Sequence, residues 1–205
     1  MQSEIASIKR LKSPKHKVSC HYLINREGLI VQMVKDRHVA WHAGKSKWKQ
    51  TTNLNKNSIG IELVNKGHQF GYQSFSNPQI TSLIKLCKTL KKKYSIKKEN
   101  FLGHSDIAPL RKNDPGEKFP WKKLSNHNLG VWFKKSRKNI TSDKYNLDTL
   151  FFKNLQKFGY RYFNIKKRNF KDKAIIKSFQ QHFSPNNVTG KIDEKTFKIS
   201  YFLTH

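Results

Sequence analysis

Residues 58–64 read Ser-Ile-Gly-Ile-Glu-Leu-Val, and this stretch decides the fold. Apolar residues alternate strictly along it, which is the pattern of a β-strand. Ile59, Ile61 and Leu63 point to one face of that strand, whereas Glu62 points to the other. We therefore predict a sheet strand that carries one acidic side chain.

Further strands are predicted over residues 18–25, 29–34 and 100–103. The first two are joined by Arg26-Glu27-Gly28, which is a hairpin connection. Helices are predicted over residues 4–11 and from Ser76-Asn77-Pro78 to near Tyr94, where Ser76 or Asn77 caps the helix and proline suits its first turn. Strands joined by long helical crossovers indicate the α/β class, with a mixed β-sheet flanked by helices.

The chain changes in texture after Trp132. Residues 134–146 are polar and read as a linker. Three helical segments follow, over residues 147–158, 171–183 and 193–203. We therefore predict a first domain over residues 1–133, a linker over 134–146 and a small three-helix domain over 147–205, which is near the lower size limit for independent folding.

The chain has 205 residues and a formal net charge of +29, spread along its whole length. Such a field attracts polyanions, namely nucleic acid, acidic lipid or an anionic cell-wall polymer. An AT-rich coding sequence, which favours Lys, Asn, Ile and Phe, is an alternative source of part of this charge. We expect no nucleic-acid partner, because no reader module or aromatic-basic stacking pattern is present.

Other classes are excluded by simple counts. No stretch approaches the roughly 20 apolar residues of a membrane span, and the first 13 residues have no hydrophobic signal core. Cys20 and Cys87 lie in apolar contexts and are predicted to be reduced core residues. As written, the chain is predicted to be cytoplasmic, and its oligomeric state is left open.

The candidate metal ligands lie in residues 103–116, which contain one histidine, one lysine and two aspartates among turn residues. Prolines at 109 and 115 prevent a continuous helix, so the segment is predicted to loop back on itself. His104 and Asp114 then provide one nitrogen and one oxygen for a first-row metal. Lys112 places a positive charge beside it.

Glu62 is an acid on an otherwise apolar strand, and burying it is costly without a partner or a role. One hypothesis makes it a general base that takes a proton from metal-bound water; the other places it in solvent at a sheet edge. Trp41 and His42 lie in a loop of small residues, where His42 contacts substrate or is structural.

These segments together resemble the type-2 (phage-lysozyme-like) family of zinc-dependent N-acetylmuramoyl-L-alanine amidases. The matching pieces are collinear over about residues 5–132, and they are Val18-Ser19-Cys20-His21-Tyr22-Leu23-Ile24, Ala40-Trp41-His42-Ala43-Gly44, Asn57-Ser58-Ile59-Gly60-Ile61-Glu62-Leu63, Gly103-His104-Ser105-Asp106-Ile107-Ala108-Pro109, and Arg111-Lys112-Asn113-Asp114-Pro115-Gly116 followed by Phe119-Pro120-Trp121. The C-terminal unit resembles a three-helix peptidoglycan-binding domain through Leu155-Gln156-Lys157-Phe158-Gly159-Tyr160, Ile176-Lys177-Ser178-Phe179-Gln180-Gln181-His182-Phe183 and Thr189-Gly190-Lys191-Ile192-Asp193.

The resemblance implies hydrolysis of the amide between N-acetylmuramic acid and L-alanine, in peptidoglycan or muropeptides, with Zn2+ as cofactor. His104 and Asp114 match two of the three zinc ligands, Glu62 matches the base, and Lys112 matches the cation that stabilises the oxyanion. Trp41 and His42 are candidate substrate contacts. Asp106 is expected to be a structural turn residue.

One element of the family pattern is not found in this sequence. The resemblance implies a first zinc-ligating histidine on a core strand before the 4–11 helix, and this chain starts at that helix. Three explanations are a misassigned start, which would restore the strand and an export signal to the cell envelope, a decaying gene, and rescue by His21 or another side chain. The alternative function is therefore an inactive, peptidoglycan-binding remnant.

Overall fold

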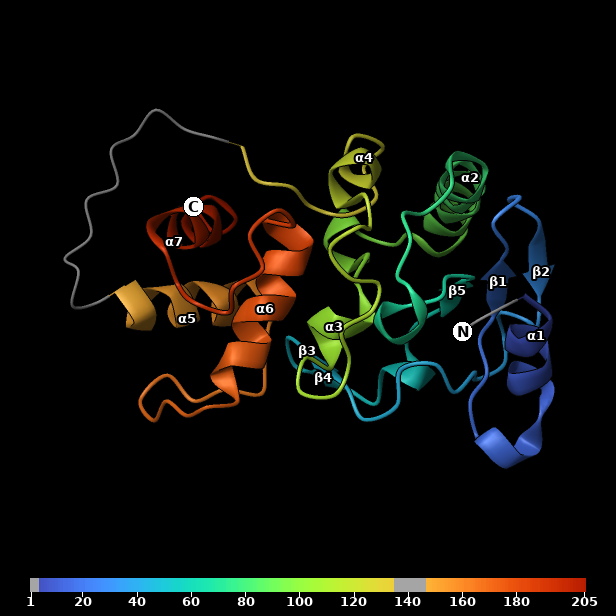
Figure 1. Cartoon of the computed structure of the whole chain (residues 1–205), viewed down its shortest axis with the longest axis horizontal. Helices are drawn as coiled ribbons and strands as arrows, with labels where there is room; N and C mark the ends of the chain where they lie inside the picture. The colour runs from blue at the N-terminus through green and yellow to red at the C-terminus, as the bar shows by residue number, and fades with distance from the viewer. Residues whose placement is uncertain (1–3, 135–146) are drawn as a thin grey trace. The chain divides into compact units, whose positions relative to one another are not determined.

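The computed structural model describes residues 4–134 and 147–205 (Figure 1). Its contacts divide these residues into two compact units. The first unit comprises residues up to 46 together with 53–97, and the second comprises 47–52 together with the described residues from 98 onward. The predicted linker, apart from residue 134, lies outside the described residues.

The first unit contains a three-stranded mixed sheet. Strand β1 (Tyr22–Ile24) pairs antiparallel with β2 (Ile30–Gln32) and parallel with β5 (Ile61–Leu63), so the strand order is β2-β1-β5. The predicted hairpin, the third strand and the α/β class are confirmed, although each strand is shorter than its apolar pattern. Leu23 lies opposite Glu62 in the parallel register.

Two helices of the first unit, α1 (Glu4–Lys12) and α2 (Asn77–Tyr94), begin and end close to their predicted positions. The unit also contains three short 3-10 helices that the sequence did not predict, η1 (Pro14–His16), η2 (Leu54–Lys56) and η3 (His68–Phe70). Ser76 caps α2, because its hydroxyl accepts a hydrogen bond from the Gln79 N–H at 3.3 Å. The apolar stripe of α2 is buried and consists of Ile80, Leu83, Ile84, Cys87 and Leu90.

Both cysteines are buried and free, as the sequence predicts. Burial raises the pKa of the Cys87 thiol to about 12. The pKa of Cys20 is raised to a similar value by burial and by the nearby charge of Glu62.

The second unit begins with a hairpin of β3 (Lys47–Trp48) and β4 (Thr51–Thr52). Its other elements are η4 (Lys98–Asn100), α3 (His104–Ile107), α4 (Trp121–Ser125), α5 (Leu147–Phe158), α6 (Asp172–Phe183) and α7 (Glu194–Phe202). The last three match the predicted helical segments within one or two residues.

The strand predicted over residues 100–103 is wrong. A 3-10 turn ends at Asn100, and Gly103 is the N-cap of α3. The Gly103 N–H donates to the carboxylate of Asp106 at 2.7 Å, so it is not available for a strand ladder.

Trp48 explains why the β3–β4 hairpin belongs to the second unit. The Lys49 N–H donates to the Gly159 carbonyl at 2.9 Å, and a Cβ on Gly159 would lie 2.6 Å from Cζ2 of the Trp48 ring. The same ring makes an edge contact with Tyr160 at 5.1 Å between centroids. Burial of one tryptophan therefore holds the hairpin against the end of α5.

Candidate active site

The segment 103–116 turns back on itself, as its prolines predict. His104 opens the short helix α3, and the Ser105 N–H donates to the Asp114 carbonyl at 2.8 Å. The two predicted ligands are thereby brought together, with Nδ1 of His104 3.1 Å from Oδ2 of Asp114. The Asp114–Pro115 peptide bond is cis.

Arg111 and Lys112 place positive charge beside this pair. Nη2 of Arg111 lies 3.3 Å from Nε2 of His104. Because a guanidinium only donates, Nε2 accepts, and Nδ1 carries the proton that faces Asp114. Burial opposes ionisation of Asp114, but its hydrogen bond with His104 and the nearby charge of Lys112 outweigh burial and lower the pKa of this carboxyl.

The geometry of the pair suits two ligand positions of a zinc ion. Zinc binds histidine nitrogen and carboxylate oxygen at about 2.0–2.2 Å, so the two donor atoms are near enough to share one ion that replaces the proton on Nδ1. Among residues 4–134 and 147–205, no group of three or more His, Cys, Asp or Glu side chains is placed to hold a metal. His104 and Asp114 could thus supply two ligands.

Glu62 lies on β5 of the first unit, whereas His104, Lys112 and Asp114 belong to the second. Its strand is at one edge of the described three-stranded sheet, as the solvent-facing hypothesis requires, but the residue is partly buried. Its charge acts on the buried Cys20 thiol. The residue therefore has the partial burial that a general base needs.

Trp41 and His42 have different surroundings within the first unit. The His42 ring lies against Gly60, and its Nε2 is 3.4 Å from the Ser58 carbonyl oxygen. The amide oxygen of Asn55 accepts the His42 N–H at 3.1 Å. Trp41 is 54% exposed, so its ring is accessible to a ligand.

His21 is the third histidine of interest, and both of its ring nitrogens are engaged. Nδ1 accepts the Gly60 N–H at 3.0 Å, and Nε2 lies 3.0 Å from the His38 carbonyl oxygen, to which it donates. The ring is also buried. His21 is therefore a structural residue that connects β5 to the 38–42 segment.

Asp106 has a larger role than the turn residue that the sequence suggests. It is 1% exposed, and its Oδ2 accepts hydrogen bonds from the Gly103 N–H at 2.7 Å and from Nδ1 of His182 at 2.8 Å. Its Oδ1 accepts the hydroxyl of Tyr160. His182 also stacks on Trp121 with centroids 4.0 Å apart. The C-terminal helices thus hold α3 through one buried carboxylate.

Local sequence patterns contain no signal for this Asp106 network. Tyr160 and His182 are 54 and 76 residues away from Asp106 in the chain. Tyr160 follows the end of α5 and His182 lies in α6, and the apolar pattern of these segments predicts only core packing.

Comparison with known proteins supports the resemblance. Residues 2–117 match the family described as N-acetylmuramoyl-L-alanine amidase. N-acetylmuramoyl-L-alanine amidase AmiD of Escherichia coli (strain K12) is 37% identical over 202 residues, which cover 89% of this chain and 72% of AmiD.

Solved structures extend the similarity to nearly the whole chain. The complex of E. coli AmiD with anhydro-N-acetylmuramic acid-L-Ala-D-gamma-Glu-L-Lys is similar with a TM-score of 0.82 at 33% identity, over 97% of this chain and 83% of that one. AmpDh3 of Pseudomonas aeruginosa, in complex with anhydromuramic pentapeptide, is similar with a TM-score of 0.85 at 30% identity, over 98% and 86%. The chain therefore belongs to the type-2 N-acetylmuramoyl-L-alanine amidase family and is an enzyme that hydrolyses amide bonds.

Proposed function

We propose that this enzyme uses zinc to hydrolyse the amide between N-acetylmuramic acid and L-alanine in peptidoglycan or muropeptides. The observation that carries the proposal is the convergence of His104 Nδ1 and Asp114 Oδ2 at 3.1 Å in a loop that also contains Lys112. The substrates bound in the AmiD and AmpDh3 complexes support this substrate class.

Each proposed residue has one chemical task. When bound, zinc polarises the carbonyl and lowers the pKa of water to about 7. Glu62 accepts a proton from the water that adds to the carbonyl carbon. Lys112 stabilises the negative charge that develops on the carbonyl oxygen, an effect typically worth a few kcal/mol. The carbon–nitrogen bond then breaks, and the proton leaves with the amino group of alanine.

The remaining assignments concern binding. Trp41 and His42 are proposed to contact substrate, with the exposed Trp41 ring packing against a sugar face. Residues 1–133 are proposed as the amidase domain and residues 147–205 as a peptidoglycan-binding unit. For intact wall as the substrate, we propose the cell envelope as the place of action. In the described residues no helix is long and apolar enough to cross a membrane.

The test combines metal analysis with product release. Purified protein is expected to retain near-stoichiometric zinc and to release stem peptide from an anhydro-muropeptide, and chelation should abolish the release. Glu62→Gln should lower kcat by at least about a hundredfold while leaving zinc content unchanged. Glu27→Gln, at an exposed hairpin position of the same unit, is the matched control and should retain full activity.

The competing hypothesis is an inactive, peptidoglycan-binding remnant. It predicts binding to purified wall without zinc uptake and without peptide release. Turnover that survives Glu62→Gln would instead refute the assignment of the base while leaving the amidase activity in place.

A further inference from the structure

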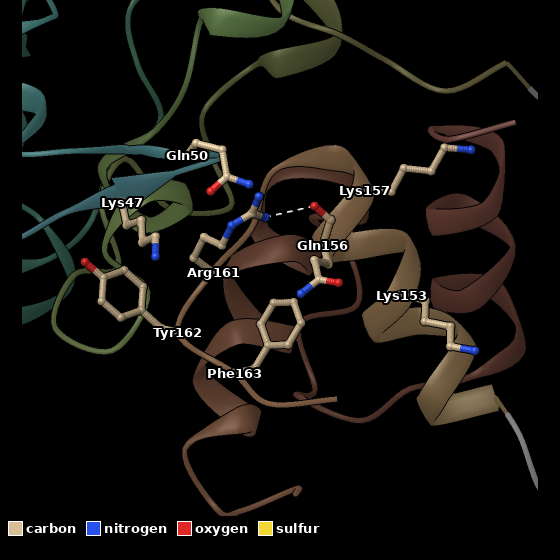
Figure 2. A pocket seen from close by; sticks show the side chains of 8 residues that line it. All are labelled: Lys47, Gln50, Lys153, Gln156, Lys157, Arg161, Tyr162 and Phe163. Atoms are coloured by element: carbon tan, nitrogen blue, oxygen red, sulfur yellow. Dashed lines mark hydrogen bonds between the residues drawn. The ribbon is translucent and has the colours of Figure 1, made fainter. Parts of the chain in front are cut away.

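A cavity of about 690 Å³ lies within the second unit, apart from the metal-ligand pair (Figure 2). Its walls come from the β3–β4 hairpin, from α5 and from the segment that follows α5. The volume falls within the range of about 300–1,000 Å³ that is typical of ligand sites. Nothing in the proposed catalytic mechanism uses this cavity.

The charge of the cavity is uniform. Lys47, Lys153, Lys157 and Arg161 line it, and no acidic residue of the described chain does. No described residue forms an ion pair with any of the four cations. A concave surface lined by charges of one sign concentrates the field and attracts the opposite ion. The cavity is therefore suited to an anion.

Arg161 is held in place for such a ligand. Its Nη1 donates to the Gln156 carbonyl at 2.8 Å and to the Tyr160 carbonyl at 2.7 Å, and the first of these bonds is drawn in Figure 2. Within the described residues its Nε and Nη2 have no hydrogen-bond partner. A guanidinium fixed by the backbone can bind a carboxylate through its remaining N–H groups with little further ordering.

The rest of the lining suits an organic ligand rather than a bare ion. The rings of Tyr162 and Phe163 line the cavity, and Phe163 is held by an edge contact with Phe152 at 4.9 Å between centroids. Gln50 and Gln156 add amide groups. Aromatic walls with a few polar groups are typical of sites for ligands with apolar and charged parts.

The cavity and the candidate active site are built from neighbouring elements, because α3, which begins at His104, packs against β3, which carries Lys47. Burial raises the pKa of the Tyr162 phenol, and the positive charge of Arg111 offsets only part of that rise. Nη2 of Arg111 also lies 3.3 Å from Nε2 of His104. The wall of the cavity that Lys47 forms therefore adjoins the helix that carries His104.

We propose that this cavity is a subsite that binds the free carboxylates of the peptide part of the substrate. The proposal rests on the proposed function, because it assumes a muropeptide at the active site. A peptide with a γ-linked glutamate keeps its α-carboxylate free and also has a terminal carboxylate. Two or more cations beside an aromatic wall match that chemistry.

The experiment measures binding without turnover. The tripeptide L-Ala-D-γ-Glu-L-Lys is titrated into the full chain by calorimetry, beside the same peptide with both carboxylates amidated. Reversal of two pocket charges with Lys153→Glu and Lys157→Glu is compared with Lys173→Glu and Lys177→Glu on α6. Both pairs are exposed, have i,i+4 spacing and change the net charge equally, but only the first lines the cavity.

The expected result is that the pocket pair weakens tripeptide binding at least about tenfold, whereas the α6 pair changes it less than about twofold. The amidated peptide should bind the unaltered chain as weakly as the tripeptide binds the pocket variant. Equal weakening by both pairs, or equal binding of both peptides, would overturn the proposal. If the double variant unfolds, the single Lys157→Gln is used, with Lys177→Gln as its control.

Failure of the subsite and failure of the proposed function give different results. If the chain releases stem peptide normally but its peptide binding does not depend on the carboxylates, only the subsite proposal is refuted. If tripeptide binding depends on the pocket lysines but the chain releases no peptide from any muropeptide, only the proposed amidase mechanism is refuted.

Discussion

Gly60 determines where the ring of His42 lies. A Cβ at this position would lie 2.6 Å from both Cβ and Cδ2 of His42, and the Gly60 N–H is already bound to His21. Gly60 has no left-handed backbone angle, so only the lack of a side chain explains the glycine. One small residue thus fixes two histidines of the first unit.

Gly60→Ala is therefore expected to displace the His42 ring and to cost about 1–3 kcal/mol of stability through overpacking. Denaturant unfolding measures the cost, and the NMR shifts of the His42 ring report the displacement. Gly67→Ala is the control, because an added Cβ there meets no atom within 4 Å and only its φ of +73° is strained. Unchanged His42 shifts in Gly60→Ala would contradict this account.

Among the site residues, the sequence predicts those whose partners are local. His104 and Asp114 are ten residues apart in a proline-bounded loop, so their convergence follows from the chain itself. The partners of Asp106 are not predictable in this way, because two helices must first pack before Tyr160 and His182 approach it. Local sequence patterns reveal where the chain turns, whereas the hydrogen bonds of Asp106 can be seen only in the tertiary structure.

At the scale of elements, Asp36 joins the end of α2 to the loop after β2. Its carboxylate accepts hydrogen bonds from Tyr94 at 2.8 Å and Lys93 at 3.0 Å, and also from Tyr22 on β1. The Asp36 side chain is 8% exposed. Burial raises its pKa, but these three donors outweigh burial and lower the pKa to about 2.

This shift predicts a pH-dependent stability. Because the folded pKa lies below the unfolded value near 3.8, the stabilisation is complete above about pH 4 and is lost as the pH falls towards 2. Asp36→Asn should therefore lower stability by about 1–2 kcal/mol at pH 7 and by much less at pH 2. Denaturant unfolding between pH 2 and pH 7 measures this difference in the free energy of unfolding. Glu27→Gln is the control, because it also removes one negative charge.

Helices and strands are predicted correctly where one face is continuously apolar. The prediction fails where a single side chain determines the local structure. The apolar stripe and Ser76 cap of α2 are both readable from the sequence. The β3–β4 hairpin was not predicted, since residues 47–52 are polar apart from Trp48, and its position depends on Gly159 far along the chain. The strand expected at 100–103 does not form, because the Asp106 carboxylate accepts the Gly103 N–H.

At the scale of the whole molecule, residues 98–134 form one compact unit with the C-terminal helices. The polar composition of residues 134–146 predicts a domain boundary there, and that division remains a prediction. Asp106 connects the two parts, because its carboxylate lies in α3 and its donors lie after α5 and in α6. Unfolding of the C-terminal helices should therefore expose the loop that carries His104.

Hydrogen exchange tests this coupling. Tyr160→Phe removes one donor to a buried carboxylate and is expected to cost about 1–3 kcal/mol. Exchange of the α3 and α6 amides should accelerate together, as expected for one cooperative unit. Tyr201→Phe on α7 is the matched control and should leave α3 unchanged. Unaltered α3 exchange in Tyr160→Phe would show that the two parts open separately.

The Asp106 network also limits how this enzyme can be engineered or rearranged by recombination. A chimera that exchanges residues 147–205 for an unrelated wall-binding module removes both Tyr160 and His182. The Asp106 carboxylate then keeps only the Gly103 N–H in a site built for three donors. A successful graft therefore requires either a new donor pair on the incoming module or a neutral residue at position 106. The C-terminal helices therefore cannot be replaced by another domain without a compensating change at or around Asp106.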